Sequence, residues 1–228
     1  MSAVSLADVS VTLDGSTVLE AASLELDARR IAIIGENGSG KSTLARVIGG
    51  LVAPSSGEVH VHGVDAVRAV RALRRKTAVV FSNPDAQIIM PTVAEDVAFS
   101  LRPQRLPRAE VAGRVEAALA DFGLTGLAGR SAHELSGGQK QLLALCGAFV
   151  RRPELVIADE PTALLDARNA RRVASHLLER PDHRLVLVTH DLALAARCDA
   201  AVLVAGGRIA ATGAPDEVIA AYEQLLVC

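Results

Sequence analysis

The sequence predicts an α/β fold with a mainly parallel sheet that helices cover on both faces. Half of the 228 residues are hydrophobic, whereas aromatic residues make up only 2% and Trp is absent. A core of Val, Leu, Ile and Ala suits strands that are buried on both faces. Short apolar segments also alternate with segments of helical periodicity, and this alternation is typical of a parallel sheet.

The first 91 residues are expected to be rich in strands. Alternating apolar and polar residues predict two half-exposed strands that meet at Asp14-Gly15, giving an antiparallel β subdomain. A short apolar strand ends at Gly35 and precedes a helix over 41–51, and a basic helix lies around 67–75. The strands are expected at 4–11, 18–26, 30–34, 58–61 and 77–81.

The middle of the chain has a different character. Thr92 and Glu95 form a capping box that opens a helix, and Pro107 starts another helix with apolar spacings of three and four. The block from 92 to 150 contains no convincing strand. It is therefore expected to be a helical subdomain inserted into the sheet.

Strands resume after this block, at 155–158, 185–188, 200–204 and 208–212. Helices are expected around 166–178 and 215–225. The sequence therefore predicts one domain over residues 1–228. Its catalytic lobe comprises 1–91 and 151–228, and its helical subdomain comprises 92–150.

Composition and charge argue against several classes of protein, although they do not exclude a local basic patch. The 24 basic and 26 acidic residues give a net charge of -2, which argues against a nucleic-acid binder that relies on bulk positive charge. Cys146, Cys198 and Cys228 lack a metal-like spacing and are expected to be reduced cytosolic thiols. Neither a signal peptide nor a membrane-spanning segment is expected from the sequence, so any membrane role is expected to come through a partner.

A phosphate-binding loop is expected between the apolar strand at 30–34 and the following helix. Its glycines let successive backbone N–H groups turn onto phosphate oxygens, and the helix N-terminus adds positive charge. Lys41 would bridge the β- and γ-phosphates, Ser42 would ligate Mg²⁺, and Thr43 could bond the α-phosphate. The alternative is a glycine-rich turn that binds nothing. The residues of this loop are Gly35, Glu36, Asn37, Gly38, Ser39, Gly40, Lys41 and Ser42.

Two carboxylates end the apolar strand at 155–158, where strand termini present side chains to a ligand. Asp159 suits the Mg²⁺ shell. Glu160 suits a general base or water-orienting group for an in-line attack on the γ-phosphate. Alone, such a pair is more often a solvated turn, but beside the loop at 35–42 it indicates catalysis. His190 ends another apolar strand and could donate to the γ-phosphate, although a lone His there is more often structural.

A second anion-binding helix start is expected at Ser136, Gly137, Gly138 and Gln139, where a serine and two glycines open a helix. The alternative is a simple capped turn with Ser136 as the N-cap. One chain with two such helix starts but one complete loop predicts a nucleotide shared between two molecules.

With these motifs in this order, the sequence resembles the nucleotide-binding domain of ABC transporters over essentially its whole length. The resemblance implies a P-loop NTPase cassette with a RecA-like core, and it implies ATP and Mg²⁺ as cofactors. It also implies two domains packed head to tail, so that Ser136 and Gly138 of one complete the ATP site on Lys41 of the other. Asp166 matches the loop that crosses this interface, in which Leu164 stands where the family usually has glycine.

Within that family the chain resembles the ATPases of energy-coupling-factor importers, which power uptake of vitamins and transition-metal ions. The segments 81–87 and 91–99 carry this likeness, with Gln87 as the group's second glutamine. The chain stops soon after its last expected helix, a brevity similar to that of the biotin system's ATPase. The resemblance implies a transmembrane coupling protein, a separate substrate-binding membrane protein, a homodimer or heterodimer of ATPase subunits, and a peripheral location at the cytoplasmic face of the membrane.

Two positions depart from the family pattern. An aromatic residue usually stacks on adenine near Leu13, where only aliphatic contact is available here. The usual glutamine after the strand at 77–81 is replaced by Ser82, which would reach Mg²⁺ through a water.

Two other classes compete with an importer ATPase. A soluble ABC protein of translation or DNA repair needs two cassettes or a long coiled-coil insertion, and neither fits in 228 residues. A lone-cassette scaffold for iron–sulfur assembly stays open, as does another type of ABC importer.

Overall fold

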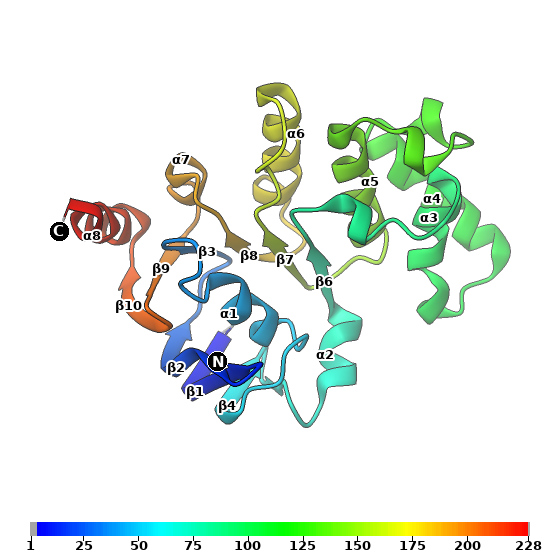
Figure 1. The fold of residues 1–228 in the computed structure, drawn as a ribbon. Helices are drawn as coiled ribbons and strands as arrows, with labels where there is room; N and C mark the ends of the chain where they lie inside the picture. The colour runs from blue at the N-terminus through cyan, green and yellow to red at the C-terminus, as the bar shows by residue number, and fades with distance from the viewer. Residues whose placement is uncertain (1–3, 228) are drawn as a thin grey trace.

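The computed structural model describes residues 4–227, which form two sheets with helices between and around them (Figure 1). The larger sheet has six strands in the order β10-β9-β3-β8-β7-β6. Its members are β3 (Arg30–Ile34), β6 (Thr77–Val80), β7 (Leu155–Asp159), β8 (Arg184–Val188), β9 (Ala200–Ala205) and β10 (Arg208–Gly213). Every pairing is parallel except that between β9 and β10, so the predicted mainly parallel sheet is confirmed.

The smaller sheet is antiparallel and contains the N-terminal strands, as predicted. Its order is β2-β1-β4-β5, built from β1 (Val4–Leu13), β2 (Ser16–Leu26), β4 (Ser56–Val61) and β5 (Val64–Asp65). The turn between β1 and β2 lies at Asp14 and Gly15, both with positive φ.

The helix α1 (Lys41–Ile48) packs against strands of both sheets, so one apolar cluster fills the space between them. This helix was expected to reach residue 51 but ends at Ile48. Its last turn closes there because Gly50 takes a positive φ of 65° and the Leu51 N–H bonds back to the Arg46 carbonyl. The left-handed turn needs glycine and stops the helix.

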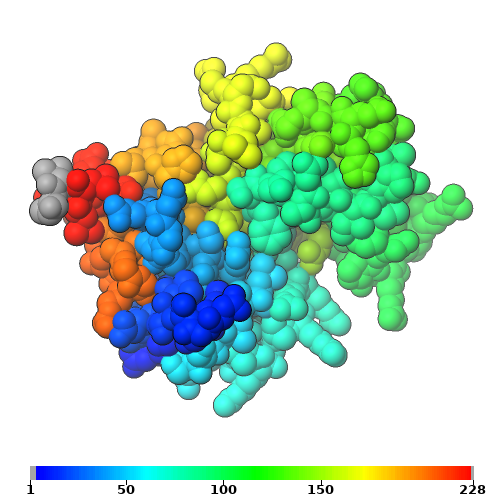
Figure 2. Space-filling view, viewed as in Figure 1, coloured from blue at the N-terminus to red at the C-terminus, as the bar shows by residue number. Residues whose placement is uncertain are grey.

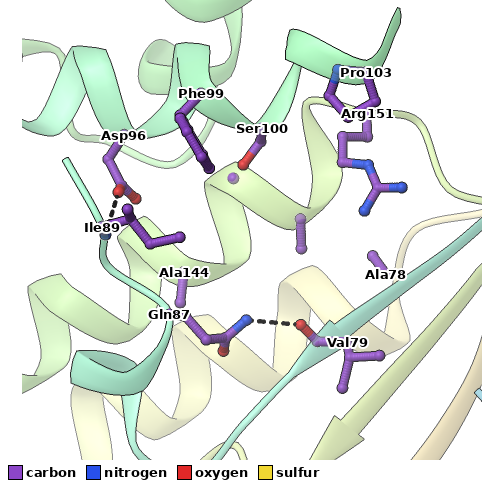
Figure 3. A pocket seen from close by; sticks show the side chains of 12 residues that line it. Ala78, Val79, Gln87, Ile89, Asp96, Phe99, Ser100, Pro103, Ala144 and Arg151 are labelled. Atoms are coloured by element: carbon purple, nitrogen blue, oxygen red, sulfur yellow. Dashed lines mark hydrogen bonds between the residues drawn. The ribbon is translucent and has the colours of Figure 1, made fainter. Parts of the chain in front are cut away.

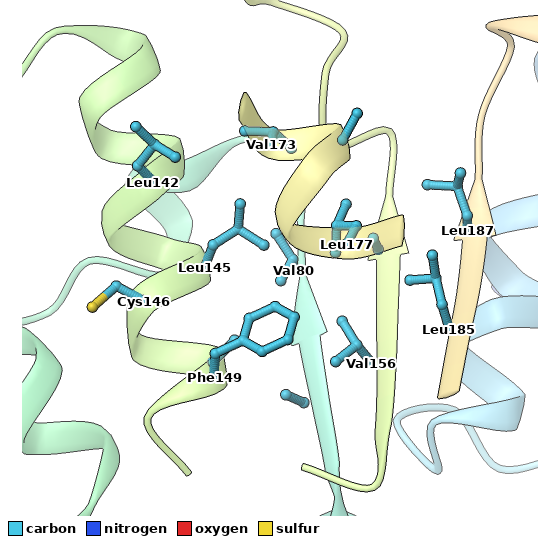
Figure 4. Close-up of a cluster of buried hydrophobic side chains, with 14 of the residues drawn as sticks. Val80, Leu142, Leu145, Cys146, Phe149, Val156, Val173, Leu177, Leu185 and Leu187 are labelled. Carbon is cyan, nitrogen blue, oxygen red and sulfur yellow. The ribbon is translucent and has the colours of Figure 1, made fainter. Parts of the chain in front are cut away.

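The opposite face of the larger sheet is covered by α6 (Ala167–Leu178), α7 (Leu192–Ala195) and α8 (Pro215–Val227), together with α5 (Gly137–Phe149). Figure 4 shows Leu142, Leu145 and Phe149 of α5 and Val173 and Leu177 of α6 directed toward the strands. The four-residue helix α7 was not predicted, because Asp191 caps a segment too short to show a helical period.

The helices of 92–150 stand beside the sheet, at the right of Figure 1. They are α3 (Val93–Ser100), α4 (Arg108–Asp121) and α5, with 3₁₀ turns at Arg102–Gln104, Thr125–Leu127 and Ala132–Glu134. The predicted capping box of Thr92 and Glu95 is present. Within residues 4–227, the only strand-like feature of this block is an isolated bridge between Thr92 and Ser131.

The basic helix α2 (Val70–Lys76) begins three residues later than expected. The Asp65 carboxylate accepts from the N–H groups of Val67 and Arg68, which holds the preceding residues in a turn.

Cys146 and Cys198 are buried free thiols, and burial raises the pKa of each to about 12. Cys228 lies outside the described residues.

Candidate nucleotide-binding site

The predicted phosphate loop joins β3 to α1, and its backbone requires glycine at two places. Gly35 has φ 141°, and a Cβ there would lie 2.1 Å from the Val204 carbonyl oxygen. Gly40 has φ 105°, and a Cβ there would lie 2.8 Å from the Val18 carbonyl oxygen. The loop therefore packs tightly against β9 and β2, while its other side borders a cavity.

That cavity has a volume of about 210 Å³ and is lined by Val18, Asn37, Gly38, Gly40, Lys41, Ser42, Thr43 and Glu160. The Lys41 ammonium lies inside the loop, with Nζ 2.8 Å from the Gly35 carbonyl oxygen and 2.6 Å from that of Glu36. Burial lowers the pKa of Lys41, while Glu160, Asp159 and Glu36 oppose this effect. A phosphate would add negative charge and favour the ammonium form.

Two oxygen groups meet beside Lys41. The Ser42 hydroxyl donates to Asp159 Oδ1 at 2.8 Å, and Asp159 is 7% exposed. The Arg46 guanidinium lies 3.6 Å from Asp159 Oδ2 and holds the other side of the carboxylate. A hydroxyl and a carboxylate are hard oxygen donors, which Mg²⁺ prefers, so this pair fits the ion. Arg46 was not predicted, although it lies one helical turn after Ser42.

Two buried oxygens at this site lack a hydrogen-bond partner within residues 4–227: Ser39 Oγ and Glu160 Oε2. Glu160 has a left-handed backbone, with φ 50°, and Oε2 lies 2.8 Å from His190 Nδ1. That contact is close but not aligned as a hydrogen bond. Because unpartnered buried oxygens are costly, both atoms suit a site that receives a polar ligand.

The sheet order explains why these residues meet. β8 lies between β3 and β7, so the carboxyl ends of the three strands emerge side by side. Asp159 pairs with Val188, which places His190 next to Glu160. The sequence motifs are far apart along the chain, and the parallel order alone brings them to one edge.

The second predicted helix start is also formed, but it does not line the Lys41 cavity of the same chain. Ser136 caps α5, accepting from the Gln139 N–H at 3.4 Å, and Gln139 Oε1 accepts from the Ser136 N–H at 3.0 Å. Gly137 has open space where a Cβ would be.

Gly138 instead faces α6. A Cβ on Gly138 would lie 2.4 Å from Asn169 Nδ2, so the glycine permits a close contact with this helix. Asn169 in turn donates to Asp166 Oδ2 at 2.7 Å, and Asp166 caps α6. The Ser136 turn and the Asp166 loop are thus joined within one chain, and sequence motifs alone do not reveal the Asn169 contact.

The two departures from the family pattern lie at the margins of this edge. Leu13, at the end of β1, is 40% exposed, and it does not line the cavity. Ser82 is exposed on the loop after β6. Gln87, which follows the 3₁₀ turn Pro84–Ala86, is held against the end of β6, because its Oε1 accepts from the Phe81 N–H and its Nε2 donates to the Val79 carbonyl, both at 2.8 Å.

A family model described as ABC transporter matches residues 19–163, a range that includes the phosphate loop, the Ser136 turn and the two carboxylates. The chain belongs to the ABC transporter family. As a member of this family it is an ATPase, and it binds ATP. The predicted P-loop cassette fold is thereby confirmed.

Two relatives indicate which kinds of ABC transporter ATPase this chain is similar to. The chain is 40% identical to a biotin transport ATP-binding protein of Rhizobium etli, over 94% of this chain and 95% of the relative. It is 38% identical to an energy-coupling factor transporter ATP-binding protein of Bacillus subtilis, over 91% of this chain and 76% of the relative.

Solved structures agree with the fold. The chain resembles cbiO1 of Clostridium perfringens, part of the ABC transporter complex cbiONQ, with a TM-score of 0.85 and 31% identity. The match covers 96% of this chain and 91% of cbiO1. It also resembles a dimeric ATP-binding cassette in a post-hydrolysis state with ADP and phosphate, with a TM-score of 0.81 and 26% identity. This match covers 93% of this chain and 98% of the solved chain.

Proposed function

We propose that this ATPase powers an importer of the energy-coupling-factor type, binding Mg-ATP between two cassettes. The observation that carries the proposal is the separation of two helix starts. Lys41 and Glu160 line one cavity, whereas the Ser136 turn of the same chain does not line it. A second cassette, identical or related, would bring its own Ser136 and Gly138 to the phosphates bound at Lys41. The dimeric solved relative supports this arrangement.

In this proposal the backbone N–H groups of 35–43 bind the phosphates, and Lys41 contacts the β- and γ-phosphates. Ser42 and Asp159 would hold Mg²⁺, and Ser82 would contribute through a water. The ion, when bound, neutralises phosphate charge. Leu13 offers aliphatic contact to the base, and Gln139 and Asp166 support the facing turn. The remaining residues of the proposed ATP site are Gly35, Glu36, Asn37, Gly38, Ser39, Gly40, Thr43 and Gly137.

Hydrolysis needs a water that is aligned with the γ-phosphate. Glu160 borders the cavity and has an unpartnered oxygen, so it is placed to orient this water and accept its proton. The His190 side chain is 64% exposed, with Nδ1 on Glu160, so the rest of its ring can turn toward the phosphate. Glu160 and His190 are therefore the proposed catalytic pair, together with Lys41.

A groove beside β6 is the proposed seat of the transmembrane coupling protein (Figure 3). It has a volume of about 280 Å³ and runs between the strand and helices α3 and α5, with Gln87, Ile89, Phe99 and Arg151 among its lining residues. Ile89 is 63% exposed, which suits an apolar contact. Next to the groove, Asp85 offers a carboxylate to arginines of the partner, although Lys140 already pairs with it at 2.7 Å.

The membrane attachment is proposed to be indirect. Among residues 4–227, no helix combines the length and apolar character that crossing a bilayer requires. The protein would sit at the cytoplasmic face of the cell membrane, and a separate membrane protein would bind the substrate. We favour a vitamin, with biotin first because of the Rhizobium etli relative, over a transition-metal ion such as cobalt.

The test is reconstitution. The chain is co-expressed with a candidate coupling protein and a candidate biotin-binding membrane protein, purified in detergent and placed in vesicles. ATP-dependent uptake of labelled biotin is expected, and none is expected from a complex carrying Glu160→Gln. The competing role, a lone-cassette scaffold for iron–sulfur assembly, would be supported if no membrane protein co-purified while the chain hydrolysed ATP.

A further inference from the structure

A stripe of arginines runs along the outer side of α2 and the turn before it. Arg71 and Arg75 are four residues apart on α2 and so share one side of the helix, Arg68 lies in the turn just before α2, and all three are exposed. The Arg68 side chain is 90% exposed. We call these three residues the α2 stripe. Figure 2 shows side chains of this cyan segment projecting from the surface.

The helix that carries the stripe is firmly attached to the core. Leu73 is 1% exposed, and Arg74 donates to the Gly50 carbonyl through Nε at 2.9 Å and Nη2 at 2.7 Å. From the other side, Arg151 donates to the Arg74 carbonyl at 3.0 Å. Arg74 and Arg151 hold α2 in place, so Arg71 and Arg75 are displayed on a firmly attached helix.

Nearby carboxylates leave most of the stripe's charge uncompensated. Asp65 lies 3.7 Å from Arg68, and Glu154 pairs with Lys76 rather than with the stripe. Within residues 4–227, neither Arg71 nor Arg75 has a carboxylate oxygen within 4.0 Å. The whole chain carries a net charge of -2, so this local concentration of positive charge contrasts with the rest of the protein. Val67, beside the stripe, is 47% exposed and adds an apolar contact.

The stripe also adjoins the groove proposed for the transmembrane partner. Arg151 lines that groove and, through the same guanidinium, touches the backbone of α2. Figure 3 shows Arg151 at the end of the groove, near Pro103. If the groove holds a membrane protein, the α2 stripe lies on the side of the molecule that is close to the bilayer.

We propose that the α2 stripe binds the phosphate headgroups of anionic lipids in the membrane that surrounds the transporter. Guanidinium groups match phosphate oxygens with two parallel hydrogen bonds, and cations near an anionic bilayer surface are attracted to it. The exposed Val67 can enter the headgroup layer. The orientation toward the bilayer rests on the proposed function, whereas binding of lipid by the chain itself does not.

Vesicle sedimentation with the full chain tests this proposal at low ionic strength, where the attraction is least screened. The probes are vesicles of phosphatidylcholine alone and vesicles with phosphatidylglycerol added. The test variant is Arg68→Glu/Arg71→Glu/Arg75→Glu. The control, Arg130→Glu/Arg197→Glu/Arg208→Glu, has the same net charge but changes exposed arginines of other surfaces.

The wild type is expected to sediment with the anionic vesicles only, and high salt should release it. The stripe variant should bind at least about tenfold more weakly, whereas the control should stay within about twofold of the wild type. ATPase rates confirm that all three proteins are folded. The proposal is overturned if the wild type does not sediment with anionic vesicles, or if the stripe variant and the control variant lose vesicle binding equally.

A third result would also overturn it. If the stripe variant bound vesicles like the wild type but no longer co-purified with the coupling protein in detergent, the stripe would contact an acidic segment of that protein instead. None of these outcomes alters the reconstitution test of biotin uptake, so failure of lipid binding is distinguishable from failure of the proposed function.

Discussion

The Lys140 ammonium lies 2.7 Å from Asp85 Oδ1, so the first turn of α5 holds the loop that follows β6. The neighbouring Gln141 is 1% exposed and strengthens this connection, because its Nε2 donates to the Phe81 carbonyl at 3.2 Å. The turn proposed to face the partner cassette and the loop proposed to face the membrane protein are therefore joined through two successive residues. A displacement of the loop after β6 should therefore also shift the Ser136 turn.

The first prediction concerns assembly with the coupling protein. Asp85→Lys should weaken co-purification, because it removes the proposed acceptor and places two ammonium groups side by side. The ATPase rate of the isolated chain should change little. Lys140→Gln is the matched control, since it frees Asp85 and should leave assembly intact or improve it. Unchanged assembly of Asp85→Lys in a pull-down would refute this placement of the partner.

The second prediction concerns the phosphate loop. Lys41→Ala removes a charge-assisted contact to the transferred phosphate, which is worth about 1.5–3 kcal/mol. The ATPase rate should therefore fall by about tenfold to a hundredfold. Arg46→Ala is a useful comparison, because it removes a cation 3.6 Å from Asp159 that does not line the cavity. Equal losses of ATPase rate in the two variants would indicate that any positive charge near the site matters, and that direct contact of Lys41 with the phosphate does not explain the loss.

The third prediction separates binding from hydrolysis. Glu160→Gln keeps the shape of the side chain but cannot accept a proton from water. It should retain ATP affinity, stop turnover and accumulate the closed dimer, which size-exclusion chromatography with ATP would detect. Turnover at the wild-type rate would show that Glu160 is not the catalytic carboxylate.

The fourth prediction concerns Ser82. A serine is shorter than a glutamine by about two bonds, roughly 2.5 Å, so a water is needed to reach the metal and basal hydrolysis should be slow. Ser82→Gln should raise the rate or tighten the Mg²⁺ dependence by up to about tenfold. The rival is Gln87, but its amide would first have to leave Val79 and Phe81. Loss of turnover in Gln87→Ala with no effect of Ser82→Gln would favour that rival.

The fifth prediction is a loss of stability in mild acid. His183 is buried with Nε2 3.0 Å from the Leu177 carbonyl oxygen, and burial lowers its pKa although Asp182 opposes this. As the pH falls below the ordinary value of 6.5, the unfolded chain gains a proton that the folded chain resists. The free energy of unfolding must then decrease.

Urea denaturation at pH 7.5 and pH 5.5 measures this effect. His183→Gln should lower stability at pH 7.5, because it disturbs a buried contact, but it should also reduce the difference between the two pH values. Part of the stability difference between the two pH values should remain in this variant, because burial also lowers the pKa values of His62 and His176. An unchanged difference in the variant would exclude His183 as a contributor.

Much of this protein is determined by local sequence. The glycines of the phosphate loop, the capping box at Thr92 and the cap at Ser136 depend on residues only a few positions apart, so spacing alone predicted them. Except for the two-residue strand β5, the strands also followed from alternating or continuous apolar residues. The family, too, was evident from motifs whose order along the chain is enough to identify it.

Only the tertiary structure decided which of these motifs meet. The strand order β3-β8-β7 brings His190 to Glu160, and the close approach of α5 to α6 places Gly138 on Asn169. The start and end of the helices also shifted where a side chain or a left-handed glycine closed a turn. Such contacts join residues far apart in the chain, and their energies depend on packing that no local pattern contains.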